Sequence, residues 1–305
     1  MKFLIISDIH SNLEALASVF LDLYNNDEKI DRVLIPGDIV GYGANPNECC
    51  TIVRFLKNGK TSLKNEIQDI IQEIDIDDTD KKNITDYILS MGKKATIIVG
   101  NHDKAVIGKP SLVSEMIASA NKAVMWTTKV LQKENVRFLK SLWFRKKLRK
   151  FGIELVHGTP VYPQGYQYLK NASTLNYDLL YSSVTFAGHT HRPAAYKYTS
   201  QKRNIAASVF IPIDQFDTRL MMLESKSMVR VEEFKITLNS GQRYYINPGS
   251  VGQPRDGTKA SYMIYDTLSK QVSLKKATYN TEAVKKKVLK AGLPFELADR
   301  IVKGI

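Results

Sequence analysis

All five histidines of the chain lie in short polar segments that directly follow apolar runs. They are His10, His102, His157, His189 and His191. His189 and His191 are one residue apart in the segment 188–192, so an extended backbone would send both imidazoles to the same side. Paired histidines also occur on solvated surfaces, and this pair alone is a weak signal. Because every histidine of the chain follows an apolar run, the distribution predicts a metal site.

Carboxylates and an amide occupy equivalent positions. Asp8 follows the apolar run 3–6, Asp38 follows 33–35, and Asn101 follows 96–99. Asp38 after a glycine could instead be an ordinary turn residue. The repeated pattern of a strand and then a polar ligand favours a functional role. Carboxylate, imidazole and amide ligands without cysteine suit Mn²⁺, Fe or Zn²⁺.

The candidate metal ligands exceed what one tetrahedral ion accepts. They are Asp8, His10, Asp38, Asn101, His157, His189 and His191. Two ions that share a bridging carboxylate would use all seven. Two ions ~3.5–4 Å apart can share a hydroxide and bind the attacking and leaving oxygens of an in-line displacement at phosphorus. The ligand set therefore predicts two divalent ions.

Alternating strands and helices must position these residues. The three apolar runs 3–6, 33–35 and 96–99 are predicted strands, and further strands are predicted at 153–156 and 184–187. Each is followed by a candidate ligand, and open α/β sheets bind their ligands at the carboxyl ends of the strands. A capping-box pattern predicts a helix from residue 13, and a long helix is predicted from about 111 to 133. Further strands are predicted at 208–213, 219–223, 229–237, 244–247, 260–266 and 272–277, before helices at 281–291 and 294–302.

Residues 57–94 differ in character from the rest. Isoleucines at helical spacing flank the acidic run 75–80, which predicts a helical hairpin. The acidic run lacks the glycine and the final glutamate of a calcium loop, so a solvated helix connection is the preferred interpretation. The prediction is one domain over 1–305 with a helical insertion at about 57–94.

Composition limits partners and location. The formal net charge of +13 would attract phosphorylated substrates or polyanions, although lysines that only coat the surface explain it equally well. The basic run 145–150 lacks interleaved aromatic residues, so nucleic acid is less favoured than a small phosphorylated substrate. No apolar stretch approaches ~18 residues, which argues against a membrane protein. The adjacent Cys49 and Cys50 are expected to be helical thiols in a reducing compartment, and a cytoplasmic protein is expected.

The polar blocks, taken in order, resemble those of the calcineurin-like metallophosphoesterases. D-x-H, G-D, G-N-H-[DE], H-G and G-H-x-H correspond to 8–10, 37–38, 100–103, 157–158 and 188–191. Each block is weak alone, but five in the family's order are a strong signal. The segments 37–43, 189–193 and 247–257 and the C-terminal helix resemble a bacterial subgroup of single-domain phosphoesterases and phosphodiesterases.

The resemblance implies an α/β fold, a four-layer αββα sandwich of two mixed sheets flanked by helices. It implies one ion bound by Asp8, His10, Asp38 and His191, and a second bound by Asp38, Asn101, His157 and His189. The same resemblance implies that His102 contacts the phosphate and protonates the leaving oxygen, and that Asp103 orients His102. Arg192 or Arg255 could bind the phosphate, or could be surface ion-pair partners. Tyr42 could line the mouth of the site or could pack in the core.

The function expected is hydrolysis of phosphate esters by a metal-bridging hydroxide, with Mn most favoured and Fe, Zn, Ni or Co as alternatives. The substrates would be phosphodiesters or small phosphorylated metabolites. One alternative is a nuclease or RNA-processing phosphodiesterase, and another is a binding module with little turnover. The protein serine/threonine phosphatases carry Asp-Arg-Gly where this chain has 41–43, and glutamate where it has Asp103. These departures argue against a dedicated phosphoprotein phosphatase.

Overall fold

Two six-stranded mixed sheets form the centre of the molecule. The computed structural model describes residues 1–108, 114, 116–169, 175, 177–200, 208–210 and 234–305. The first sheet has the order β3-β2-β1-β11-β12-β9 and the second β4-β5-β6-β10-β7-β8. The first sheet comprises β1 (Lys2–Ile5), β2 (Arg32–Ile35), β3 (Ala95–Ile97), β9 (Phe234–Thr237), β11 (Ala260–Asp266) and β12 (Gln271–Ala277). The second comprises β4 (Arg145–Leu148), β5 (Ile153–Val156), β6 (Val184–Phe186), β7 (Pro193–Thr199), β8 (Ser208–Phe210) and β10 (Gln242–Pro248).

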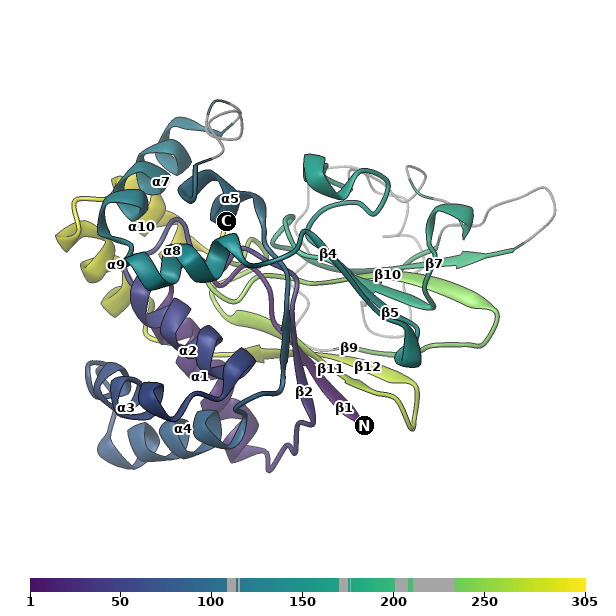
Figure 1. The fold of residues 1–305 in the computed structure, drawn as a ribbon, viewed down its shortest axis with the longest axis horizontal. Coiled ribbons are helices and arrows are strands. Elements are labelled where there is room, and N and C mark those ends of the chain that lie inside the picture. Colours follow the sequence, from purple (N-terminus) through teal and green to yellow (C-terminus); the bar gives the residue numbers. More distant parts are fainter. Residues whose placement is uncertain (109–113, 115, 170–174, 176, 201–207, 211–233) are drawn as a thin grey trace.

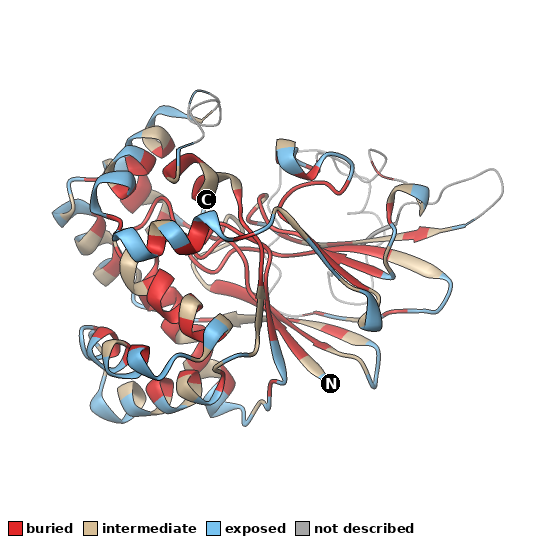
Figure 2. Ribbon diagram, viewed as in Figure 1, coloured by how far each residue is buried: buried red, intermediate tan, exposed pale blue. Residues whose placement is uncertain are grey.

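The two sheets pack face to face through alternating apolar side chains. Phe3 and Ile5 of β1 join Leu155 and Phe186 of the second sheet in one buried cluster. Leu4, their neighbour on the strand, points the other way into the cluster beneath the helices. This period of two is the ordinary consequence of strand geometry. It explains why β1 is apolar on both faces, since each face packs against a core (Figure 2).

The described α-helices lie together on one side of the molecule (Figure 1), and the first two of them contact strands of the first sheet. They are α1 (Leu13–Asn25), α2 (Pro46–Asn58), α3 (Lys64–Gln72), α4 (Asp78–Ser90), α5 (Asn101–Val106), α7 (Ala118–Val130), α8 (Lys133–Lys140), α9 (Thr281–Lys290) and α10 (Phe295–Lys303). On the second sheet, Leu169, which follows η3 (Pro163–Gly165), and Leu175 and Leu180, which flank η5 (Tyr177–Leu179), share a buried cluster with Tyr198 and Tyr245. The predicted fold, two mixed sheets flanked by helices, is confirmed.

Several predicted boundaries need correction. The long helix predicted over 111–133 is wrong in extent, because α7 begins at Ala118 and α8 follows it after a break at residues 131–132. The predicted strand 219–223 lies outside the described residues, as do parts of 208–213 and 229–237. Strand β4 was missed because its sequence, Arg-Lys-Lys-Leu, is charged, as edge strands often are. Strand β7 was missed because it begins with Pro193, which a strand tolerates at its first position.

The segment predicted as an insertion forms α3 and α4, which pack against α2 and α1. Asp77 caps α4 by accepting a hydrogen bond from the Asp80 amide, at 2.9 Å. The two ends of this inserted segment lie side by side, since a Cβ placed on Gly92 would be 3.2 Å from the Gly59 Cα. In the part of the chain that the structure describes, no helix is both long and apolar enough to cross a membrane.

Candidate metal centre

The carboxyl ends of strands from both sheets converge on one buried site. Asp8 and His10 follow β1, Asp38 follows β2, and Asn101 begins α5 after β3. The second sheet contributes the residue after β5 and two residues between β6 and β7, which are His157, His189 and His191. Parallel strands place these ends at the same edge of each sheet. The structure therefore brings together all seven predicted ligands.

One group of ligand atoms comprises Asp8, His10 and His191, each buried. The Nε2 atoms of His10 and His191 are 3.0 Å apart. Asp8 Oδ1 lies 3.4 Å from the Nε2 atom of His191 and 3.9 Å from that of His10. These separations let the three groups face a common point.

A second group comprises Asp38, His157 and His189, also buried. The Nε2 atom of His157 is 3.1 Å from Asp38 Oδ2 and 3.0 Å from Asn101 Oδ1. Asp38 Oδ2 also lies 3.7 Å from His10 Nε2 in the first group. Asp38 therefore lies between the two groups, and Asp8 Oδ1 approaches the second group less closely, at 4.0 Å from His157 Nε2.

Backbone carbonyls fix the orientation of three imidazoles. The Nδ1 atoms of His10, His157 and His191 donate to the carbonyl oxygens of Val40, Pro36 and Gln253, at 3.1, 2.8 and 2.8 Å. A carbonyl can only accept, so each Nδ1 carries the proton, and the neutral rings of His10 and His191 direct their Nε2 lone pairs into the site. Hydrogen bonds of this kind orient metal-binding histidines in general.

This arrangement fits cations. In the neutral rings of His10 and His191, two lone pairs face each other at 3.0 Å, which is unfavourable without a positive charge between them. His189 Nε2 is buried and lacks a hydrogen-bond partner among the described residues. Buried polar atoms without partners are costly, and metal ions would satisfy them. Carboxylate, imidazole and amide donors suit Mn, Fe or Zn.

The backbone is strained at the same residues. Asp8, His10, Asp38, His189 and His191 all have positive φ, between 48° and 74°. Residues other than glycine rarely adopt this conformation, at a cost of ~1–2 kcal/mol each. Strained backbone of this kind is concentrated at functional sites, because it directs side chains to positions that regular secondary structure does not allow.

Two glycines allow the segments to approach closely. A Cβ on Gly100 would collide with Asp38 Oδ1, and one on Gly188 would collide with the Asp8 carboxylate. Asp8 accepts the backbone N–H of His189 at 3.0 Å, and Asp38 accepts that of His102 at 2.9 Å. The glycines of the motifs thus let each carboxylate bind the backbone of another motif.

Burial and mutual charge set the protonation of the site. Burial lowers the pKa of His10, His189 and His191 well below the usual range, so these rings are neutral. Burial alone would also lower the pKa of His157, but the Asp38 carboxylate raises it to about 9. Burial raises the pKa of Asp8 to about 7. Without metals, the site therefore holds protons that metal ions must displace.

His102 lies beside the ligand groups. Its ring centroid is 4.4 Å from that of Tyr42 and 4.9 Å from that of His10, and its Nδ1 atom is buried without a described partner. Burial lowers the pKa of His102 to about 4. Asp103 accepts hydrogen bonds from three backbone amides, those of Ile39, Val40 and Gly100, at 2.9–3.0 Å. Asp103 thus joins the first turn of α5 to the Asp38 loop, and any orienting effect on His102 runs through that backbone.

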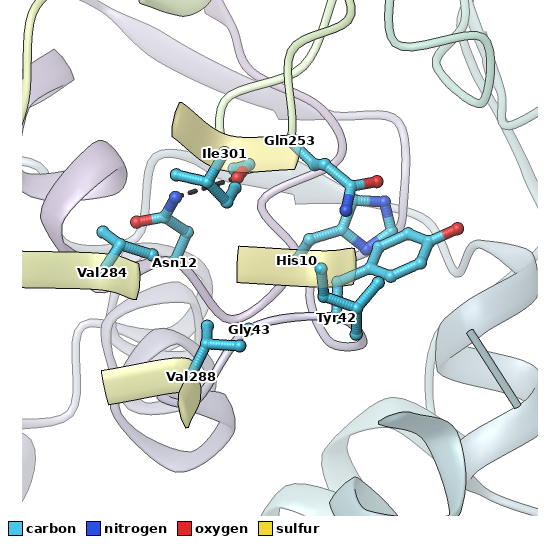
Figure 3. Close-up of a pocket in the computed structure, with 10 residues that line it drawn as sticks. His10, Asn12, Tyr42, Gly43, Gln253, Val284, Val288 and Ile301 are labelled. Atoms are coloured by element: carbon cyan, nitrogen blue, oxygen red, sulfur yellow. Dashed lines mark hydrogen bonds between the residues drawn. The ribbon is translucent and has the colours of Figure 1, made fainter. Parts of the chain in front are cut away.

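Tyr42 both packs and borders the site. Its ring lies 4.6 Å from that of His10, and only 7% of its surface is exposed. Beneath it, a small pocket is bounded by His10, Tyr42 and Gln253 on one side and by Val284 and Ile301 of α9 and α10 on the other. Figure 3 shows the Tyr42 hydroxyl directed away from Val284. The C-terminal helices therefore support the site from behind.

The mouth of the site holds a tyrosine that the sequence reasoning missed. The Tyr168 ring stacks on the His189 imidazole at 3.8 Å and is 50% exposed. Tyr168 follows His157 by eleven residues in a loop without a recognisable motif, and only the tyrosine pair 166 and 168 hinted at it.

The two arginines considered for phosphate binding lie near the site. Arg192 is exposed, and its positive charge lowers the pKa of Asp256, which burial raises. The positive charge of Arg255 lowers the pKa of His102 and of Tyr168. Phosphate binding by Arg192 stays a prediction.

Comparisons with known proteins agree with this geometry. The family model for calcineurin-like phosphoesterases matches residues 1–193, which include every ligand position. The uncharacterized protein MJ0912 of Methanocaldococcus jannaschii is 31% identical over 303 residues, covering 98% of this chain and 97% of that protein. The crystal structure of a metallophosphoesterase from Sphaerobacter thermophilus is 29% identical, with a TM-score of 0.68 over 100% of this chain and 99% of that one.

A hypothetical protein of Pyrococcus horikoshii, PH1004, shares the fold at 15% identity, with a TM-score of 0.61 over 100% of this chain and 98% of that one. The family match spans more than half of the chain, and the buried ligand groups are those that a metal-dependent hydrolase needs. This chain belongs to the calcineurin-like phosphoesterase family and is a metal-dependent phosphoesterase.

Proposed function

We propose that this protein hydrolyses phosphodiesters or small phosphorylated metabolites at a centre of two divalent metal ions. One observation carries the proposal: two buried groups of three ligands each lie side by side, with Asp38 between them. A site for one ion would leave one of the two groups unused.

The first ion would be held by Asp8, His10, Asp38 and His191, and the second by Asp38, Asn101, His157 and His189. Mn²⁺ is the favoured metal, and Fe, Zn, Ni and Co ions accept the same donors. When bound, two such ions supply positive charge to the phosphoryl oxygens and lower the pKa of water.

The protein's own residues would orient the substrate around this centre. His102 lies outside both ligand groups, with its Nδ1 atom unpartnered. It would contact the phosphate and donate a hydrogen bond to the leaving oxygen. Because burial lowers the pKa of His102 to about 4, it would transfer a proton only once the negative charge of the bound substrate had raised that pKa. Asp103 would hold the α5 turn that carries His102, through the three backbone amides it binds.

A substrate panel tests the proposal. Metal-depleted protein would be reconstituted with each divalent metal and assayed with p-nitrophenyl phosphate, bis-p-nitrophenyl phosphate, nucleotides and sugar phosphates. We expect turnover of at least one small ester, strongest with Mn²⁺ and abolished by a chelator. Hydrolysis of oligonucleotides alone would reject the small-substrate proposal.

A nuclease is the second candidate function, and a spatial observation supports it. The fold places exposed Trp143 and Tyr181, 69% and 63% exposed, beside the basic strand β4. The Lys147 ammonium lies 4.7 Å from the Tyr181 ring centroid, and the Arg145 guanidinium 5.7 Å from it. Aromatic rings beside cations are typical of surfaces that bind single-stranded nucleic acid.

Salt dependence separates the two candidates. If basic side chains of the protein neutralise several phosphates of a labelled single-stranded oligonucleotide, binding should weaken as salt is added. The logarithm of the binding constant should then fall with the logarithm of the salt concentration, with a slope of roughly −0.7 per phosphate contact. For the small-substrate function we expect a shallow slope. A nuclease would be established by a steep slope together with cleavage of the oligonucleotide. The double variant Lys146→Gln, Lys147→Gln should then reduce the slope, and the control double variant Lys285→Gln, Lys286→Gln on α9 should not.

We also place the protein in the cytoplasm. Cys49 and Cys50 are both buried free thiols on α2, which fits a reducing compartment.

A further inference from the structure

The side-chain amide of Asn12 makes two hydrogen bonds to different parts of the fold. Its Oδ1 atom accepts the backbone N–H of Ala15 at 3.0 Å and so caps the N-terminus of α1. Its Nδ2 atom donates to the carbonyl oxygen of Gly252 at 2.8 Å (Figure 3). Because a backbone N–H only donates and a carbonyl only accepts, these two partners fix which amide atom is which. Asn12 is 1% exposed, so water does not compete for either contact.

Gly252 belongs to the loop 249–257, which lies directly against the segment that carries Asp8. The Gly252 N–H donates to the Asp8 carbonyl at 2.9 Å, and Ser250 Oγ donates to the same carbonyl at 2.8 Å. A Cβ on Gly252 would lie only 1.8 Å from the Ile9 carbonyl oxygen, so only glycine fits at this approach. The contact with Asn12 therefore holds the loop where it is closest to the first ligand group.

One residue further along the loop lies the acceptor that orients His191. The Gln253 carbonyl accepts the Nδ1–H of His191 at 2.8 Å, which fixes the tautomer and the direction of this ring. The Gln253 N–H belongs to the same peptide unit as the Gly252 carbonyl, and it donates to Ser250 Oγ at 2.8 Å. Asn12 thus holds the peptide unit immediately before the one on which the orientation of His191 depends.

We propose that Asn12 is a positioning residue for the first metal ion and acts on His191 through the loop 249–257. Without the amide donor, the Gly252 carbonyl would lose its buried partner and the loop would shift, so the Gln253 carbonyl would hold His191 less well. The second ligand group depends on other contacts, since the Pro36 carbonyl orients His157. The inference rests on the proposed two-metal function and names a residue that maintains one of its two ion sites.

An asparagine that caps another helix provides the matched control. Asn280 caps α9 by accepting the Ala283 N–H at 3.0 Å, and this cap is exposed. Asn12→Ser and Asn12→Asp both keep an oxygen that can cap α1. Serine has no second polar atom for Gly252, and aspartate places an oxygen against the Gly252 carbonyl. Asn280→Ser and Asn280→Asp make the same substitutions at the control cap.

The test uses the full-length protein and reads metal binding and the state of His191 separately. Each protein is stripped of metal and titrated with Mn²⁺ alone by calorimetry, and its thermal unfolding is recorded. With isotope-labelled histidine, NMR follows the Nδ1–H of His191, which His191→Gln identifies, and uses that of His157 as the internal reference. Asn12→Ser is also combined with His191→Ala, because two residues that act through one contact have non-additive effects.

We expect both Asn12 variants to bind one Mn²⁺ ion as wild type does and the other about 10–100-fold more weakly, the loss typical of a group that orients a metal ligand. Asn12→Asp should have the larger effect, because two oxygens then repel each other. The Nδ1–H signal of His191 should shift or be lost while that of His157 remains. The Asn280 variants should match wild type, and Asn12→Ser should cause no further loss of Mn²⁺ affinity in the His191→Ala protein.

A residue that only caps α1 would behave otherwise. Unchanged Mn²⁺ affinities and an unchanged His191 signal in the Asn12 variants would overturn the proposal. Equal weakening of both ions with a lower unfolding temperature, or a further loss in the His191→Ala protein, would also overturn it.

The NMR measurement separates this inference from the proposed function. If wild type binds no second ion, the two-metal function fails, and the His191 signal still decides whether Asn12 positions this ring. If wild type binds two ions and hydrolyses esters while the Asn12 variants match it in both measurements, the function stands and this inference fails.

Discussion

The Nε2 lone pairs of His10 and His191 face each other because each ring donates its Nδ1 proton to a backbone carbonyl. That orientation is maintained by backbone in the left-handed region at both residues. Without metal, the folded chain therefore carries two costs: the backbone is held in a disfavoured conformation, and the two lone pairs repel each other. At the residue scale, this combination is the clearest sign that the site is built for cations.

His102 should affect rate rather than metal content. It lies outside both ligand groups, and positioned acid–base groups typically contribute ~10²–10⁴-fold. We expect His102→Ala to retain its metals, to lose activity by a factor of that order on alkyl phosphates, and to lose less on nitrophenyl esters, whose leaving group needs little protonation. Parallel kinetics and elemental analysis check this. A variant as active as wild type at equal metal content would remove His102 from the mechanism.

Metal binding should release protons in a pH-dependent way. In the metal-free site the pKa of Asp8 is raised to about 7, chiefly by burial, and Asp38 raises that of His157 to about 9 against the effect of burial. Because the ion competes with these protons, metal affinity should rise with pH up to about 9. Calorimetry at pH 7 in two buffers of different ionisation enthalpy should show release of about one proton or more, and less above pH 9. No release at pH 7 would contradict the assigned protonation.

At the element scale, the strands that end in ligands were the most predictable part of the fold. Residues 153–156 and 260–266 were predicted with the bounds that β5 and β11 have, because each run is mostly apolar and lies between segments of glycine and polar residues. The edge strand β4 could not be predicted from the hydrophobic pattern, because three of its four residues are charged and its side chains are exposed or half-buried. Tyr168 could not be found either, because its contact with His189 depends on how a loop folds back.

Excision of the α3–α4 hairpin tests its independence from the site. Because Gly59 and Gly92 lie side by side, residues 60–91 can be removed and the two glycines joined directly. The variant should keep its metal content but be less stable, since α4 covers Phe20 of α1, and exposing that ring costs about 2 kcal/mol. Thermal unfolding and metal analysis measure the two effects. A folded variant that binds no metal would show that the hairpin is part of the centre.

At the scale of the whole molecule, two sheets whose strands are interleaved along the chain bring the ligand-bearing ends of their strands to one site. The first sheet supplies Asp8, His10, Asp38 and Asn101, and the second supplies the remaining histidines. The loop 249–257 ties the two together through Asp8 and His191. A site assembled across the sheet interface requires both sheets to fold, so we expect bound metal to raise the stability of the whole domain.

The metal content of wild type and Asp38→Ala, measured together with hydrolysis of a nitrophenyl ester, tests the central claim most directly. After reconstitution with Mn²⁺ and removal of free metal, wild type should hold close to two ions per chain, one for each ligand group, and should lose activity to a chelator. Asp38→Ala should lose metal and activity together, because its carboxylate lies between the groups. Wild-type protein with only trace metal after reconstitution, or an Asp38→Ala variant that keeps both ions, would contradict a dinuclear centre bridged by Asp38.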